Sequence, residues 1–124
     1  MIGGVAERDV EVVEIYVPRR LEYLSELYKW LREQLEDPYA SLLKGFSIYE
    51  VSGAYIGTRL YTEQTMVVRL IFELATEDKT QVAHEGRINH IAENILEITG
   101  FKEEEVWLIR TQAVKTVCTP PSVN

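Results

Sequence analysis

The side chains best suited to binding chemistry are concentrated in one connection, residues 52–64. It contains two tyrosines, an arginine, a glutamate and two glycines: Tyr55, Tyr61, Arg59, Glu63, Gly53 and Gly57. Aromatic rings stack on planar ligands, a guanidinium donates paired hydrogen bonds to an anion, and glycine lets a ligand approach the backbone closely. We therefore predict a ligand site at Gly53, Tyr55, Arg59, Tyr61 and Glu63. The alternative is a hairpin loop whose tyrosines pack on a neighbouring subunit.

Two further arginines, Arg69 and Arg110, fall inside segments that alternate like strands. Ion pairs across the sheet with Glu50 or Glu73 would account for both guanidinium groups. An anion site is the alternative, and for that reason Arg110 is included among the predicted ligand-binding residues.

Neither histidine nor cysteine predicts a catalytic or metal centre. His84 and His90 are six residues apart, which is not the i, i+4 spacing that places two imidazoles on one helix face, so we expect two surface histidines. Either one would serve as a general base only if it faced a pocket. Cys118, the only cysteine, is expected to be a reduced thiol, and about four ligands would be needed for zinc. Since phosphate-loop, dinucleotide and serine-nucleophile motifs are also absent, we expect a protein that is not an enzyme.

Composition indicates one soluble domain spanning residues 1–124. Hydrophobic residues make up 46% of the chain and charged residues 27%, as in globular proteins, and the apolar runs are too short to span a membrane. The net charge of −7 argues against a nucleic-acid partner. The first nine residues lack the pattern of a secretory signal, so we expect a cytoplasmic protein with flexible ends at about 1–8 and 119–124.

Hydrophobic periodicity predicts six elements in the order β-α-β-β-α-β. Strands with period-two alternation are expected over 9–17, 46–52, 64–75 and 106–117, and amphipathic helices over 19–35 and 81–99. The apolar stripe of the first helix is predicted to consist of Leu21, Leu24, Leu27, Tyr28, Leu31 and Leu35, and that of the second helix of Ile88, Ile91, Ala92, Ile95 and Ile98. Proline is expected to end the first strand at Pro18 and the first helix at Asp37, and Gly100 to end the second helix. The segment 64–75 has an entirely apolar face, so it is the predicted central strand.

This order predicts an α+β, ferredoxin-like sandwich: a four-stranded antiparallel sheet with both helices on one face. The opposite face would then be uncovered, and alternation assigns Tyr16, Val51, Val67 and Ile71 to it. An open apolar face usually contacts another subunit, so we predict a homo-oligomer.

The sequence GFSIYEVSG, residues 45–53, resembles the second strand of the PII-like signalling proteins, the strand that leads into the long T-loop of that family. The likeness extends to EIYVPRRLEYLSEL at 14–27, MVVRLIFELATED at 66–78 and EVWLIRTQAVKTV at 105–117. The resemblance extends over most of the domain, largely through the order of the elements and through these short matches.

The resemblance implies a trimer of ferredoxin-like subunits that binds nucleotides or other small metabolites in the clefts between subunits. Residues 52–64 would be the T-loop, with Gly53, Tyr55 and Arg59 nearest the ligand. This T-loop is short, and the acidic GFKEEEV at 100–106 replaces the glycine-rich phosphate-binding turn of classical members. A divergent member is therefore expected, with a ligand other than ATP or with none.

Two other functions are compatible with the same elements. One is a dimeric ferredoxin-like enzyme that acts on an organic substrate between helices and sheet, with His84 or His90 lining the cavity. The other is a structural, partner-binding module whose interface is the uncovered sheet face. The resemblance favours a trimer, and the enzyme alternative a dimer.

Overall fold

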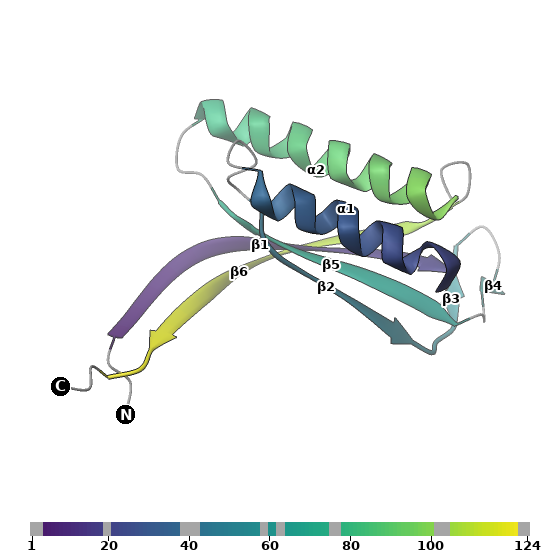
Figure 1. Ribbon diagram of the computed structural model, residues 1–124, viewed down its shortest axis with the longest axis horizontal. Coiled ribbons are helices and arrows are strands. Elements are labelled where there is room, and N and C mark those ends of the chain that lie inside the picture. The colour runs from purple at the N-terminus through teal and green to yellow at the C-terminus, as the bar shows by residue number, and fades with distance from the viewer. Residues whose placement is uncertain are drawn as a thin grey trace.

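The computed structural model describes residues 4–18, 21–37, 43–57, 60–61, 64–74, 78–100 and 105–121. They form an α+β structure in which a four-stranded antiparallel sheet carries two helices on one side (Figure 1). The strands are β1 (Gly4–Pro18), β2 (Leu43–Val51), β5 (Thr65–Glu73) and β6 (Trp107–Thr119). The helices are α1 (Leu24–Glu36), after a short 3₁₀ turn at Leu21–Tyr23, and α2 (Asp78–Thr99).

The sheet has the order β2-β5-β1-β6, so β5 is an inner strand, as predicted for residues 64–75. A small hairpin of β3 (Tyr55–Ile56) and β4 (Leu60–Tyr61) lies in the connection between β2 and β5. Within the described residues, no helix is long and apolar enough to cross a membrane.

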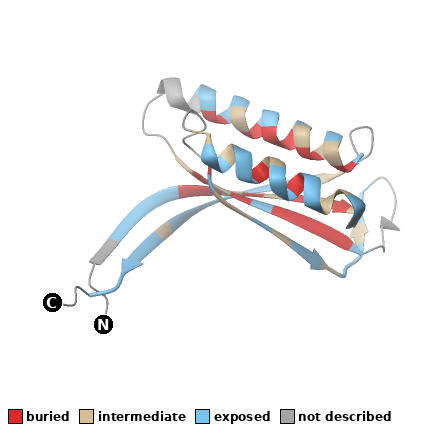
Figure 2. Ribbon diagram, viewed as in Figure 1, coloured by how far each residue is buried: buried red, intermediate tan, exposed pale blue. Residues whose placement is uncertain are grey.

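The core forms between the helices and one face of the sheet. Met66, Val68, Leu70 and Phe72 alternate along β5 and are at most 1% exposed, which confirms the predicted apolar face. The stripe predicted on the second helix is also confirmed: it packs against these side chains through Ile88, Ile91, Ala92 and Ile95. Figure 2 shows the buried residues gathered between the two layers.

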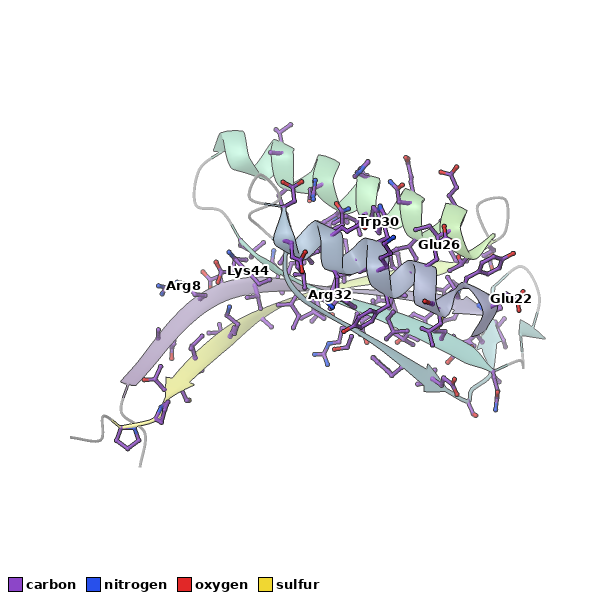
Figure 3. All side chains as sticks on the ribbon, in the orientation of Figure 1. Arg8, Glu22, Glu26, Trp30, Arg32 and Lys44 are labelled. Atoms are coloured by element: carbon purple, nitrogen blue, oxygen red, sulfur yellow. The ribbon has the colours of Figure 1, made fainter. Side chains whose placement is uncertain are left out.

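The stripe predicted on the first helix is only partly buried. Leu27 and Leu31 are fully buried, but Tyr28 is 51% exposed and Leu35 37% exposed. Trp30, which was not assigned to the stripe, packs against the core and lies between α1 and α2 (Figure 3). The difference arises because α1 also contacts α2, so the buried side of α1 is rotated toward its neighbour.

Both predicted helix ends agree with the backbone. Asp37, which precedes a proline in the sequence, is extended with φ −72° and ψ 115°. Gly100 has φ 79°, a left-handed conformation that glycine adopts without a steric penalty.

Strands β1 and β2 begin earlier than predicted. β1 begins at Gly4 rather than at Asp9, because residues 4–8 pair with residues 115–119 of β6, where a loose chain start was expected. β2 begins at Leu43, three residues early, and its register shifts between Leu43 and Gly45. A bulge there interrupts the alternation, which is why the sequence did not indicate the start of β2.

Candidate functional site

An aromatic cluster lies on the side of the sheet that carries no helix. Tyr16 of β1 and Trp107 of β6 are opposite each other in the register, and Tyr55 of β3 packs edge-on against both. The ring centroids of Tyr55 and Tyr16 are 5.8 Å apart, and those of Tyr55 and Trp107 are 5.4 Å apart. Tyr55 therefore attaches the hairpin in residues 52–64 to the sheet.

The two glycines of this connection allow close packing. A Cβ atom at Gly53 would lie 2.8 Å from the Tyr55 hydroxyl oxygen, and a Cβ atom at Gly57 would overlap the carboxylate of Glu105. A side chain at either position would therefore displace the end of the Tyr55 or Glu105 side chain from its place beside the hairpin backbone, a role that the ligand hypothesis did not consider.

The register confirms that the four predicted residues share the helix-free face. Tyr16 is opposite Val67, and Ile71 and Val51 belong to the same alternation. Val67 is 1% exposed although no helix covers this side, whereas the other three are half-buried. The face therefore carries apolar and aromatic side chains beside the polar Glu14, Arg69 and Ser47, and its rings already cover part of it.

Glu14 places a carboxylate on this face, opposite Arg69 in the register. The Tyr49 hydroxyl donates a hydrogen bond to Glu14 Oε2 at 2.7 Å. That hydrogen bond, followed by burial, raises the pKa of Tyr49 above its ordinary value of 10.0. Burial, with the charge of Glu14, also raises the pKa of Tyr16. Both phenols thus keep their protons at neutral pH and can donate hydrogen bonds.

Arg110 lies on the other side of the sheet and does not join this cluster. In the register Arg110 is opposite Val13, whose side chain faces the helices, whereas Trp107 is opposite Tyr16. Four of the six predicted ligand residues can be placed: Gly53, Tyr55 and Tyr61 in one hairpin, and Arg110 away from it. Tyr61 pairs with Tyr55 through the backbone of β4. Arg59 and Glu63 lie outside the described residues.

The ion pairs of Arg110 differ from those predicted. Its Nε and Nη2 donate to Glu11 Oε1 at 3.1 and 2.6 Å, and its Nη1 and Nη2 donate to the two carboxylate oxygens of Glu85 at 2.7 and 2.6 Å. Glu73, one of the expected partners, instead accepts from Lys115 Nζ at 3.0 Å. The hydrogen bonds from Arg110 lower the pKa of Glu85, and that from Lys115 lowers the pKa of Glu73.

His84 corrects the prediction of two surface histidines. It is 2% exposed, its Nε2 lies 3.2 Å from Glu11 Oε1, and its ring packs edge-on against Phe72 at 5.3 Å. Within the described part of the chain, His84 Nδ1 has no hydrogen-bond partner. His90 is exposed, as predicted.

A signal for this buried cluster was present in the sequence. His84 precedes Ile88 by one helical turn and so extends the apolar stripe of α2. Glu11 alternates with Val13 and Ile15, so it points toward the helices. A polar residue on each of two apolar faces indicates a buried pair, because neither group would be buried alone.

A carboxylate that orients an imidazole is a common arrangement for a general base. Here Glu11 and His84 are 6% and 2% exposed, so neither presents a reactive atom to solvent. The cluster therefore joins α2 to β1 and β6 and acts as a structural contact. Among the described residues, no group of His, Cys, Asp and Glu side chains is arranged to hold a metal ion.

The ion pairs of Glu85 with Arg110 and of Glu73 with Lys115 should make the folding stability depend measurably on pH in the acid range. Because the folded-state pKa values of Glu85 and Glu73 lie below their ordinary value of 4.5, the pairs stabilise the fold above that pH. The stabilisation is lost as the pH falls through the folded-state pKa values. Since Glu85 is 51% exposed, we expect Glu85→Gln to cost less than about 1 kcal/mol at pH 7 and progressively less as the pH falls below 4.5.

Urea unfolding of the unmodified protein and of the Glu85→Gln variant, repeated from pH 7 down through 4.5, measures how the cost of the substitution changes with pH. Glu73→Gln tests the same effect at the second ion pair, which Glu73 forms with Lys115. A cost of Glu85→Gln that did not change with pH would contradict an electrostatic origin.

Comparison with known proteins adds no family to these observations. No family model matches the chain, and no curated protein sequence matches it.

Proposed function

We propose that this chain is a homo-oligomeric protein of PII-like architecture that binds a small ligand and regulates a partner. The ligand site would lie between subunits, at the hairpin in residues 52–64. Support comes from the four-stranded antiparallel sheet of order β2-β5-β1-β6 with both helices on one side, as expected for the ferredoxin-like subunit that we propose. It also comes from the position of the hairpin, between the second and third strands of the main sheet.

The packing of Tyr55 between Tyr16 and Trp107 is the observation on which the proposal depends most. It fixes the base of the connection against the helix-free face of the sheet, the face that a second subunit would cover. A ligand bound at the hairpin would therefore contact both subunits, and its binding would be linked to assembly.

The chemistry of the site favours a planar or anionic small molecule. Tyr16 and Tyr55 offer ring edges and hydroxyl groups, and Arg59 in the same connection supplies a positive charge. The acidic segment 103–105 would repel a polyphosphate, so we expect a ligand with fewer charges than ATP.

The first measurement is the solution mass by sedimentation. The PII-like architecture predicts a trimer. Thermal unfolding with a panel of mononucleotides and dicarboxylic acids then tests binding, because a ligand that binds only the folded protein raises the melting temperature.

The variant Tyr55→Ala should weaken binding of any ligand found by at least about tenfold. The matched control is Tyr28→Ala, since Tyr28 is a half-exposed tyrosine of α1 on the other side of the sheet. A monomer whose melting temperature no ligand raises would exclude the proposal. A stable assembly without ligand binding would instead favour a structural, partner-binding module.

A further inference from the structure

A tyrosine of β2 reaches across a neighbouring strand on the helix-free face of the sheet. Tyr49 is opposite Val67 of β5, and Val67 is opposite Tyr16 of β1, so β5 separates Tyr49 from β1. The Tyr49 hydroxyl nevertheless donates to Glu14 Oε2 of β1 at 2.7 Å. Because neighbouring strands are about 4.8 Å apart, the two side chains together span roughly 10 Å across the sheet. The Tyr49 ring therefore leans over β5 and lies along the sheet instead of pointing away from it.

The position of this ring explains how Val67 is covered. Val67 is 1% exposed, although both helices lie on the other side of the sheet (Figure 1). It stands between Tyr49 and Tyr16 in one cross-strand row, directly below the path from Tyr49 to Glu14. One face of the Tyr49 ring thus packs on the sheet, while the residue as a whole remains 37% exposed. The outer face of the ring is available to stack on a flat group.

Two opposite charges lie beside this ring without pairing with each other. Arg69 of β5 is directly opposite Glu14, a position in which a guanidinium and a carboxylate usually form an ion pair. Glu14 instead accepts from Tyr49, and among the residues that the structure describes no hydrogen bond or ion pair engages Arg69. The pKa of Tyr49 is raised chiefly by the hydrogen bond to Glu14, and the charge of Arg69 opposes that shift, so the guanidinium lies near the ring. The exposed guanidinium and the second carboxylate oxygen, Glu14 Oε1, are both available to a ligand.

These groups together are complementary to a zwitterion with a planar side chain. A guanidinium donates paired hydrogen bonds to a carboxylate, a carboxylate oxygen accepts from an ammonium group, and the Tyr49 ring stacks on an aromatic group. Residues opposite each other in an antiparallel pair have Cα atoms about 5 Å apart, so Arg69 and Glu14 select charges that are close together in one molecule. A polyphosphate would be repelled by Glu14, and a simple organic cation by Arg69. An α-amino acid carries both charged groups on one carbon atom.

We propose that the helix-free face binds an aromatic amino acid: Arg69 binds its carboxylate, Glu14 Oε1 binds its ammonium group, and Tyr49 stacks on its ring. This inference rests on the ligand-binding function proposed above, and it names the class of the ligand. The site adjoins the hairpin, because Tyr16 shares a row with Tyr49 and packs against Tyr55. A second subunit that covered this face would enclose the ligand.

Calorimetric titration with phenylalanine and three analogues tests each part of the recognition. Phenethylamine lacks the carboxylate, hydrocinnamate lacks the ammonium group, and alanine lacks the ring. Each analogue forfeits either a charge-assisted hydrogen bond or the burial of an aromatic ring, so each should bind at least about tenfold more weakly than phenylalanine. An analogue that bound as tightly as phenylalanine would contradict the role of the group that it lacks.

Two substitutions connect the charged groups of the ligand to their residues. Arg69→Gln should weaken phenylalanine binding by at least about tenfold without weakening phenethylamine binding, because that analogue has no carboxylate. Glu14→Gln keeps an acceptor oxygen for the Tyr49 hydroxyl, and it should weaken the binding of phenylalanine but not of hydrocinnamate. The matched control is Arg32→Gln, because Arg32 is an exposed arginine of α1 that pairs with Glu36. It should bind phenylalanine like the unmodified protein.

The outcomes separate this inference from the proposed function. If a mononucleotide or a dicarboxylic acid raises the melting temperature but phenylalanine binds no more tightly than its analogues, the amino-acid site is overturned and the proposed function stands. A protein that binds neither phenylalanine nor any member of that panel would overturn both. Phenylalanine binding that is weakened by Arg69→Gln and by Glu14→Gln, but not by Arg32→Gln, would support the inference even if the protein were a monomer.

Discussion

Replacing Phe72 with alanine should lower the free energy of unfolding by about 3–5 kcal/mol, the range for a fully buried aromatic side chain. Phe72 is 0% exposed on the inner strand β5 and belongs to the hydrophobic cluster between the sheet and the helices. Its removal would leave a cavity against the buried His84 ring, which packs on it edge-on. Because small domains have a total stability of about 5–15 kcal/mol, the loss is a large part of the whole.

Urea unfolding at a fixed protein concentration measures this effect, since assembly would otherwise change the apparent stability. The control is Tyr28→Ala, which truncates a half-exposed aromatic side chain packed against Phe46 and should cost about 1 kcal/mol. A cost for Phe72→Ala no larger than that of the control would show that the two layers do not pack around β5.

Replacing Glu11 with alanine should cost about 2–3 kcal/mol through a different mechanism. The Glu11 carboxylate is buried, lies within hydrogen-bonding distance of His84 Nε2 and accepts hydrogen bonds from the Arg110 guanidinium. Truncation would leave a buried imidazole nitrogen without its partner, and unsatisfied buried polar groups are costly. Arg110 is 33% exposed and keeps Glu85, so the cost should fall below the 3–5 kcal/mol expected, roughly, for a fully buried ion pair.

Two comparisons isolate the role of Glu11. Glu11→Gln preserves the size and one acceptor oxygen, so it should cost less than the alanine variant. Glu85→Gln removes the exposed partner of the same arginine and should cost less than about 1 kcal/mol. If Glu11→Ala cost no more than Glu85→Gln, the buried cluster would not stabilise the contact between α2 and the sheet.

Local patterns accounted for most of the architecture. Strict alternation from Met66 to Phe72 indicated an inner strand, and the spacing of Ile88, Ile91 and Ile95 indicated the buried side of α2. These patterns are reliable because the backbone geometry of a strand or helix sets how many residues separate side chains on the same face. The helix ends at Gly100 and Asp37 are local as well, because they depend on the left-handed conformation of a glycine and on the proline that follows Asp37 in the sequence.

The candidate site was predicted less completely. The hairpin was expected where Tyr55 and Tyr61 now pair, but Arg110 was assigned to the same ligand site and lies on the opposite side of the sheet. Alternation alone could have separated them, because it places Arg110 and Trp107 in different sets. Glycine was interpreted as a ligand-binding residue, and only the positions of Tyr55 and Glu105 showed the packing constraint at Gly53 and Gly57.

The sequence by itself determined the types and order of the main elements and the faces that become the core, since hydrophobic periodicity and the Gly and Pro stops act over a few residues. Only the tertiary structure decided the length of the β1–β6 pairing, the packing of Tyr55 and the partners of His84. The reason is separation along the chain: Glu11 meets His84 across 73 residues and Arg110 across 99. No local pattern specifies such a partner, because it exists only after β6 and α2 have packed on β1.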